Sequence, residues 1–388
     1  MKAYVVGGAV RDRLLGATVH DRDWVVVGAT PDQMLAAGYT PVGRDFPVFL
    51  HPVTHEQYAL ARTERKAGLG YHGFVFHAAA DVTLEQDLAR RDLTINAIAE
   101  DPATGELIDP FGGRRDLEQH VLRHVSDAFA EDPVRLLRLA RFAARWPQFA
   151  VADATLALLK RLVASGEVDA LVPERVWQEV SRGLNEAQPS RMVALLRECG
   201  ALARLAPALD ACLADPAARA RTMRAIDHAP ATTMPRFACL VHALEAAASG
   251  RDGLPPLQAL CARWRVDADS RDLAVMVARE WPTLHRADTP FDPPRCLALL
   301  ERCDAWRRPE RLHGALPAFD ALAAASGDDA TVYTVQRRCA LVRHGLQAAQ
   351  AVQVATLSPS QRQAPGPALG QALRQARLWA IAEVFARS

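Results

Sequence analysis

Two short apolar segments near the start of the chain, separated by a glycine pair and a helix-like stretch, constrain the fold most strongly. Tyr4 to Val6 is typical of a strand, and Gly7-Gly8 ends it before a helix-like stretch from Val10 to Leu15. Asp23 to Val27 is a second strand, rich in valine. Glycine lets a backbone approach a phosphate closely, and a helix N-terminus offers N–H groups and a positive dipole end. This order predicts a phosphate-binding turn, with a plain tight turn as the alternative.

The mixed pattern of strands and helices continues to about residue 125. Thr30-Pro31 has the residues of an N-cap and a first helical position, which predicts a helix from Asp32 to Ala37. Phe46 to Leu50 and Gln57 to Ala61 are predicted to pair as strands, with the turn at Pro52 to His55.

From about Asp127 onward, apolar residues recur at helical spacing. Helices are predicted near 132–146, 153–165, 173–186 and 189–199, with several more through 350 and an amphipathic one over Leu369 to Ala386. Ser358 to Pro367, with three prolines and a glycine, is predicted to be a linker or an exposed loop. The fold class is therefore α+β, with an N-terminal mixed sheet and helices followed by an all-α C-terminal half. We divide the chain into 1–126, 127–200, 201–356 and 357–388.

Composition excludes several classes of protein. The 388 residues are enough for several domains, and neither a membrane-spanning run nor a signal-peptide pattern is present, so we expect a cytosolic protein. The seven cysteines all lie between Cys199 and Cys339 without a C-x-x-C pair, which favours buried thiols over disulfides or a zinc site. Because the net charge is only +1, any nucleic-acid surface must be a local concentration of Arg and Lys.

Asp21 and Asp23 lead directly into the second strand. Residues i and i+2 of a strand point to the same face, so both carboxylates should project together. Their mutual repulsion is relieved by a divalent cation, and Mg²⁺ is favoured because it takes oxygen ligands. A metal pair would clamp the attacking and leaving oxygens of an in-line displacement. A D-x-D alone is weak, because a solvated turn has the same residues, and the preceding Gly7-Gly8 turn strengthens it.

Four blocks in this order carry a resemblance to a known family. They are Gly7 to Asp12, Asp21 to Trp24, Arg90 to Ala97 with the sequence RRDLTINA, and Glu131 to Phe142. Together they closely resemble the class II tRNA nucleotidyltransferases, the bacterial CCA-adding enzymes, over roughly the first 200 residues. The subgroup looks like the proteobacterial multifunctional CCA proteins, in which an HD-type phosphohydrolase domain follows.

The resemblance implies an activity and a site. The enzyme would add or repair the 3′-terminal CCA of tRNA from CTP and ATP without a template, on a polymerase β-like nucleotidyltransferase head, and no membrane or obligate protein partner is inferred. Mg²⁺ would bind Asp21 and Asp23. The nucleotide would contact further positions of the matched blocks, namely Gly8, Arg11, Arg91, Arg138 and Arg141.

The helix after Asp132 has a basic stripe of its own, formed by Arg135, Arg138, Arg141 and Arg145 at spacings of three, three and four. In the family that this chain resembles, an Asp and an Arg of this motif act as a protein template that accepts C or A, and Asp132 and Arg135 match them. The alternatives are a solvated helix face for the stripe and an ordinary N-cap for Asp132, since Pro133 follows it.

Arg62 to Lys66 with Gly68, Gly70, Tyr71 and Gly73 resembles the flexible loop of the family. We expect the stretch from Gly68 to Gly73 to be mobile, so that the pocket changes shape between C and A addition. Glu64 is either a third carboxylate near the metals or a hinge residue of this loop.

The chain departs from the family at the HD-type domain. Such a domain needs an adjacent His-Asp pair, and His242 is followed here by Ala243. No His lies between Ala217 and Ile226, where the first ligand is expected. We therefore expect no metal-dependent phosphohydrolase activity, and a helical scaffold that braces tRNA instead, with Arg374 and Arg377 as candidate contacts.

Two other functions fit the same head. A poly(A) polymerase shares the motifs, but the segment Val42 to Phe46 lacks the basic pair expected there in the polymerases. A catalytically inactive RNA-binding protein on the same fold would be expected to lose Asp21 or Asp23, and both are present.

Overall fold

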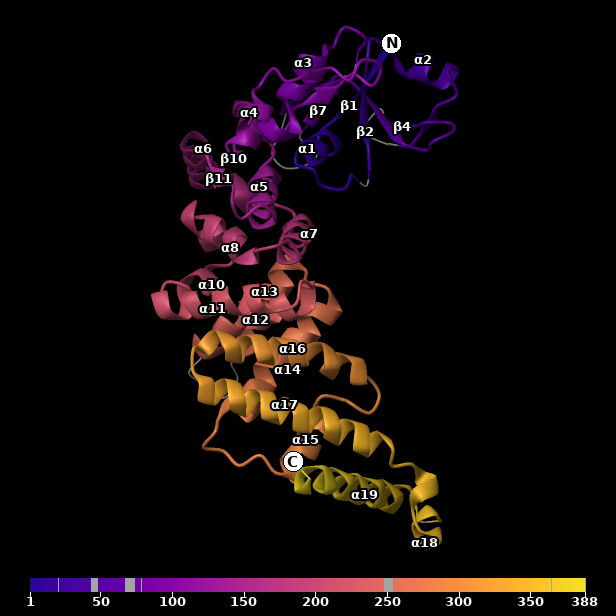
Figure 1. Cartoon of the computed structure of the whole chain (residues 1–388), viewed down its shortest axis with the longest axis vertical. Helices are drawn as coiled ribbons and strands as arrows, with labels where there is room; N and C mark the ends of the chain where they lie inside the picture. Colours follow the sequence, from indigo (N-terminus) through magenta and orange to yellow (C-terminus); the bar gives the residue numbers. More distant parts are fainter. Residues whose placement is uncertain are drawn as a thin grey trace. The chain divides into compact units, whose positions relative to one another are not determined.

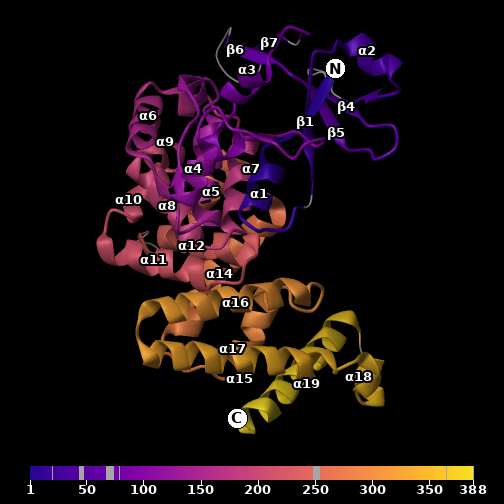
Figure 2. The same ribbon diagram turned by 45° about the horizontal axis from the view of Figure 1, so that its top comes forward.

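The computed structural model describes residues 1–19, 21–42, 48–66, 74–77, 79–247, 254–363 and 365–387. The chain forms two compact units, one of Met1–Gly183 with Arg191–Leu205 and the other of Leu184–Ser190 with Ala206–Ser388. In Figures 1 and 2 the strands belong to the indigo and magenta part of the chain, and the orange and yellow part is helical. The predicted fold class is confirmed: a mixed sheet with helices is followed by a largely helical region.

The first unit is built on a seven-stranded sheet with the order β3-β4-β5-β2-β1-β8-β9. Strand β2 is parallel to β5 and antiparallel to β1, and the other neighbours are antiparallel. The strands are β1 Lys2–Val6, β2 Asp23–Val27, β3 Thr40–Pro41, β4 Val48–Leu50, β5 Gln57–Leu60, β8 Ala99–Glu100 and β9 Leu107–Ile108. Two small sheets pair β6 Thr63–Lys66 with β7 Phe74–His77, and β10 Val121–Leu122 with β11 Ala150–Val151.

Both faces of the central strand β2 are covered. Val25 packs on one face with Val6, Leu88 and other residues around α3, and we call this face A. Its neighbour Val26 packs on the opposite face, face B, with the side chains of Met34 and Phe49. Because side chains alternate along a strand, Asp23 shares face A with Val25, and Trp24 shares face B with Val26.

The helices of the first unit follow their caps and periodicity. Thr30 forms the predicted capping box, with Gln33 N–H donating to its hydroxyl and the Gln33 side chain accepting from Thr30 N–H. The helices are α1 Gly8–Leu14, α2 Pro31–Ala36, α3 Leu84–Ala89, α4 Gly113–Glu118, α5 Val134–Arg145, α6 Asp153–Ala164, α7 Pro173–Leu184, α8 Pro189–Glu198 and α9 Ala201–Leu205. The 3₁₀ turns are η2 Thr94–Asn96, η3 Asp127–Glu131 and η4 Glu167–Ala170.

The second unit is a helical array around a buried apolar core that includes Phe237 and Phe319. Its helices are α10 Pro207–Cys212, α11 Pro216–His228, α12 Thr233–Ala247, α13 Leu254–Trp264, α14 Ala268–His285, α15 Pro293–Arg302, α16 Pro309–Ser326, α17 Asp329–Gln350, α18 Pro359–Arg362 and α19 Gly366–Ala386, with a 3₁₀ turn η5 at Val354–Thr356. The cysteines are unpaired, and all but the half-buried Cys212 are buried, as predicted. No helix of the described residues is long and apolar enough to cross a membrane.

The structure differs from the sequence-based expectations in two places. The segment predicted as a linker contains the short helix α18, which Ser358 caps, and α19 begins at Gly366 within the same segment. The region predicted to be all-α contains β11, which pairs with β10 of the head. Helix α18, with four residues, and strand β11, with two, are too short to leave a periodic pattern in the sequence.

Gly113 offers a test of how the head is held together. A Cβ added there would collide with the carbonyl oxygen of Thr94 and approach Ile98, so α4 and η2 would have to separate. We expect Gly113→Ala to lower the free energy of unfolding by about 1–3 kcal/mol, measured by chemical denaturation. Gly366→Ala is the control, because no atom lies within 4 Å of the added Cβ. Equal stability of the two variants would contradict this packing.

Candidate active site

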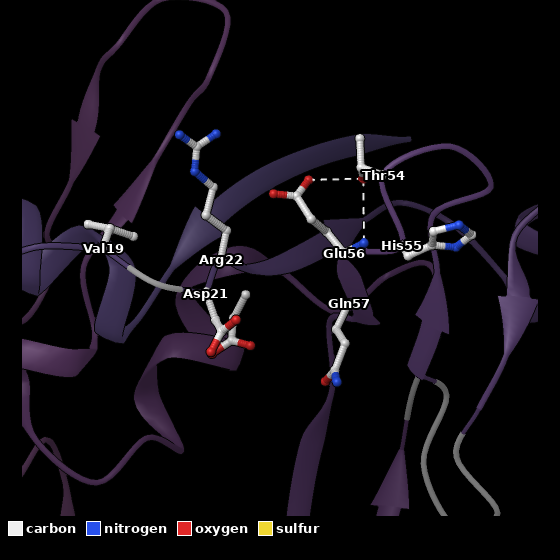
Figure 3. Close-up of a pocket in the computed structure, with 8 residues that line it drawn as sticks. Val19, Asp21, Arg22, Thr54, His55, Glu56 and Gln57 are labelled. Atoms are coloured by element: carbon white, nitrogen blue, oxygen red, sulfur yellow. Dashed lines mark hydrogen bonds between the residues drawn. The ribbon is translucent and has the colours of Figure 1, made fainter.

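The two aspartates open onto one cavity. Asp23 is the first residue of β2, and Asp21 lies two residues before it. Both are exposed, and both line a cavity of about 670 Å³ with Arg22, Glu56 and Gln57 among its other walls (Figure 3). The structure therefore brings the two carboxylates to the same cavity, as the i, i+2 spacing predicted.

A second cavity, of about 500 Å³, shares the lining residue Asp23 with the first. Seven arginines and three aspartates line it, which makes it a site for an anion. Its lining residues are Gly7, Gly8, Arg11, Asp23, Arg62, Arg90, Arg91, Asp92, Asn96, Asp132, Arg135, Arg138, Phe142 and Arg175. Of the residues that the resemblance assigned to the nucleotide, only Arg141 is not among these lining residues.

Gly7 brings the backbone close to Arg91 at this cavity. Its φ of 72° lies in the left-handed region, and a Cβ added there would lie 2.9 Å from Arg91 Nη1. Arg91 Nη2 donates to Asp87 at 3.2 Å, while its Nε is buried and has no hydrogen-bond partner among the described residues. The predicted glycine turn therefore lies directly against Arg91, whose Nε is the donor without a partner among the described residues.

Arg11 begins a largely buried chain of polar contacts. Its Nη1 donates to Asn96 Oδ1 at 2.5 Å, and its guanidinium lies over the ring of Trp146, 4.8 Å from the centroid. Asn96 in turn donates to Asp92 Oδ1 at 2.8 Å, and Arg138 Nε donates to Asp92 Oδ2 at 2.9 Å. Burial alone would raise the pKa of Asp92, but Arg138 and Asn96 bring it down to about 2.

The basic stripe of α5 is divided among several partners. Arg135 is buried and donates to the carbonyl of Ala128 at 2.9 Å, and Arg138 pairs with Asp92. Arg141 Nε donates to Glu179 of α7 at 2.8 Å, and Arg145 Nη2 donates to Asp12 at 3.2 Å. The stripe is thus no simple solvated face, since each member has a partner on another element or turn.

Asp132 makes two kinds of contact. Its Oδ1 accepts from Val134 N–H at 3.1 Å, so it does cap the first turn of α5, although the helix begins one residue later than an N-cap at Asp132 would place it. Its Oδ2 accepts from Arg175 Nη2 of α7 at 3.2 Å. Arg175 was not among the residues predicted from the sequence, because no local pattern connects residues that lie so far apart in the chain.

Two predicted features lie outside the described part of the chain. The side chain of Glu64 and the whole segment 67–73, with its glycines, are not described, and only the backbone of β6 is placed. Among the residues that the structure does describe, no group of three or more His, Cys, Asp and Glu side chains is arranged to hold a metal.

In the helical unit, His242 lies in a mainly apolar pocket of about 250 Å³ with Ala243 and Cys239. Its ring meets Trp281 edge-on at 5.4 Å, and its Nε2 is buried without a hydrogen-bond partner in the described chain. Burial, with a smaller contribution from His285, lowers the pKa of His242 to about 4. The ring therefore stays neutral near pH 7.

The candidate RNA contacts of α19 are engaged within the helical unit. Arg374 Nε donates to Glu301 at 2.8 Å, and Arg377 lies over the Trp306 ring, 4.3 Å from its centroid.

Comparison with known proteins places this geometry in a family. Residues 3–123 match the Poly A polymerase head domain, and residues 148–213 match the probable RNA and SrmB-binding site of polymerase A. The multifunctional CCA protein of Leptothrix cholodnii is 53% identical, covering 98% of this chain and 96% of that protein. That of Chromobacterium violaceum is 58% identical over 80% of this chain and 81% of its own length.

Solved structures agree in fold. The Bacillus stearothermophilus CCA-adding enzyme in complex with CTP gives a TM-score of 0.68 at 24% identity, covering 98% of this chain and 88% of that one. The Thermotoga maritima CCA-adding enzyme complexed with tRNA gives 0.62 at 21% identity, covering 99% and 91%. With relatives about half identical over nearly its whole length, this chain belongs to the multifunctional CCA proteins, which are class II CCA-adding enzymes.

Proposed function

We propose that Asp21, Asp23 and the arginine-lined cavity perform the nucleotidyl transfer of a CCA-adding tRNA nucleotidyltransferase. The observation that carries this assignment is that Asp23 lines both cavities, so a nucleotide held by the arginines would present its phosphates to the two carboxylates. The 3′-hydroxyl of tRNA attacks the α-phosphorus of CTP or ATP, a new P–O bond forms, and pyrophosphate leaves with the electrons of the broken bond.

The donor set fits Mg²⁺. Two exposed carboxylates at one cavity match the few protein ligands that Mg²⁺ takes when substrate phosphates supply the others. Asp21 and Asp23 would hold the ion, which would supply charge neutralisation at the reacting phosphate. Arg11 and Arg91 both line the neighbouring cavity, and Arg11 is held by Asn96, which supports a role for both in binding the triphosphate.

Gly8 and Arg138 complete the phosphate side of the site in this proposal. Gly8 lines the cavity and opens α1, so the first N–H groups of this helix are proposed to contribute to phosphate binding. Arg138 is oriented by Asp92. Arg141 does not line the cavity, and it is proposed to stabilise the pocket through its hydrogen bond to Glu179 of α7.

Base selection is assigned to Asp132 and Arg135. Both line the arginine-rich cavity, and a carboxylate beside a guanidinium fork offers an acceptor and several donors to the edge of a base. C and A both present an exocyclic amino group that a carboxylate can accept from. Arg175 pairs with Asp132 and is proposed to hold that carboxylate in its reading position.

The relatives that match nearly the whole chain are multifunctional CCA proteins, which favours CCA addition over poly(A) synthesis. The match to the head domain alone does not separate these two activities. An inactive RNA-binding protein would not need two carboxylates at a shared cavity wall. For the organisation of the chain we retain the proposal of a head at 1–126, a neck at 127–200, a helical body at 201–356 and a tail at 357–388. Transfer RNA would contact the helical region through phosphates and shape, because every tRNA must be accepted.

We also propose that the helical unit has no metal-dependent phosphohydrolase activity. Ala243 stands where the adjacent carboxylate of a His-Asp pair is required, and a site that loses both a His and a carboxylate ligand holds metal poorly. The surroundings of His242 support this proposal, because its ring packs against Trp281 and its neighbours in the pocket are mainly apolar.

The first test replaces the two carboxylates. Asp21→Asn and Asp23→Asn should each lower CMP and AMP incorporation into tRNA that lacks its end by about a thousandfold or more, because the charge that binds the metal is lost. Gel-shift binding of tRNA should persist, and Asp32→Asn on the exposed side of α2 is the control. The wild-type enzyme should stop after three additions, whereas continued addition of A would contradict CCA synthesis.

A second test addresses Arg175. Arg175→Gln should reduce the preference for CTP and ATP over UTP and GTP by about tenfold, while stability changes by less than about 1 kcal/mol because the pair is partly exposed. Arg204→Gln is the control, since Arg204 also pairs with a partly exposed aspartate, Asp169, and neither residue lines the arginine-rich cavity. Equal loss of kcat/KM for all four nucleotides would argue against a role in selection.

A third test concerns hydrolysis. Pure protein with Ni²⁺ or Co²⁺ should release no product from 2′,3′-cyclic AMP above the metal-only background, in a preparation that adds CCA normally. Hydrolysis that is robust in the wild type and lost in His242→Ala would refute the proposal, because contamination would not depend on His242.

A further inference from the structure

The neighbour of Asp23 in the sheet is an amide. Strands β2 and β5 run parallel, and their register pairs Asp23 with Gln57 and Trp24 with Tyr58. The Trp24 and Tyr58 rings stack with centroids 4.9 Å apart and planes 4° from parallel, so partners in this register share a face. Because side chains alternate, Asp23 and Gln57 both project from the opposite face, face A.

The carboxylate next to Gln57 is turned away. Glu56 directly precedes β5, where alternation puts its side chain on the same side as that of Tyr58, and its Oε2 accepts from the Thr54 hydroxyl at 3.1 Å. Figure 3 shows the Glu56 side chain extending to one side of the strand, and the Asp21 and Gln57 side chains extending to the other. The side chain that faces the aspartates is therefore the neutral one.

We propose that the side-chain carbonyl oxygen of Gln57 is a third, uncharged oxygen ligand of the divalent cation held by Asp21 and Asp23. This inference rests on the proposed function for those two residues. Hard cations bind amide as well as carboxylate oxygens, and Gln57 is exposed in the same cavity as both aspartates. Asp21, Asp23 and Gln57 together would contribute a charge of −2 at the ion.

A low ligand charge has a consequence for binding order. Metal affinity rises with the number of charged ligands, so the protein alone should hold the cation weakly. The triphosphate of CTP or ATP brings the remaining negative charge, and the cation should therefore enter together with the nucleotide. Arg22, which lines the cavity but extends away from Asp21 in Figure 3, does not add a charge to this ligand set.

The experiment measures Mn²⁺ binding to the full-length, nucleotide-free protein by the EPR signal of free Mn²⁺. Gln57→Glu should tighten Mn²⁺ binding by roughly tenfold, because a full charge joins the ligand set. Gln57→Leu should weaken it several-fold, because an oxygen is lost without a change of charge. Unfolding midpoints of the variants confirm that each is folded.

A paired change separates ligation from general electrostatics. The double variant Glu56→Gln with Gln57→Glu keeps the net charge and moves the carboxylate from face B to face A. It should bind Mn²⁺ as tightly as Gln57→Glu, and Glu56→Gln alone should stay within about twofold of the wild type. Wild-type affinity in both Gln57→Leu and the double variant would overturn the role of Gln57.

Failure of the underlying assignment would look different. If Asp21→Asn and Asp23→Asn bind Mn²⁺ like the wild type, the metal is not held by the aspartates, and the proposed function fails together with this inference. If those two variants lose Mn²⁺ while the Gln57 variants remain unchanged, only the role of Gln57 is rejected.

Discussion

The buried chain from Arg11 through Asn96 and Asp92 to Arg138 is the contact on which the rest of the site depends. It joins α1, which follows the glycine turn, to η2 and to α5. Asp92 is buried, and removing the partner of such a charge costs about 3–5 kcal/mol, or less here because Arg138 is partly exposed. The glycine turn and helix α5, which follows Asp132, therefore keep one relative position.

The ion pair between Arg175 and Asp132, at the proposed base-selecting end of the cavity, is weaker than this buried chain. Arg175 and Asp132 are both partly exposed, and exposed ion pairs contribute about 0–1 kcal/mol. A carboxylate held that loosely can exchange a guanidinium proton donor for the amino group of a base without a large penalty. In the proposed site, the end that would bind phosphate is therefore the more rigid one, and the end that would contact the base is adjustable, as addition of first C and then A requires.

Sequence alone predicted the local parts of this arrangement well. Strand β2 has the predicted bounds Asp23–Val27, and helices α5 to α8 begin and end within two residues of the predicted limits. Caps, periodicity and the i, i+2 rule act over a few residues, so they are visible in the sequence. The four arginines of α5 were correctly placed on a helix, but their partners on other elements could not be read from their spacing.

The parts that were missed are pairings between distant segments. Asn96 lies 85 residues from Arg11, and Arg175 lies 43 residues from Asp132. Gln57 reaches Asp23 only through the register of two parallel strands, and a shift of one residue would have brought Glu56 to face A in its place. The charge at the proposed metal site therefore depends on strand register, which stacking of Trp24 on Tyr58 helps to fix on the opposite face.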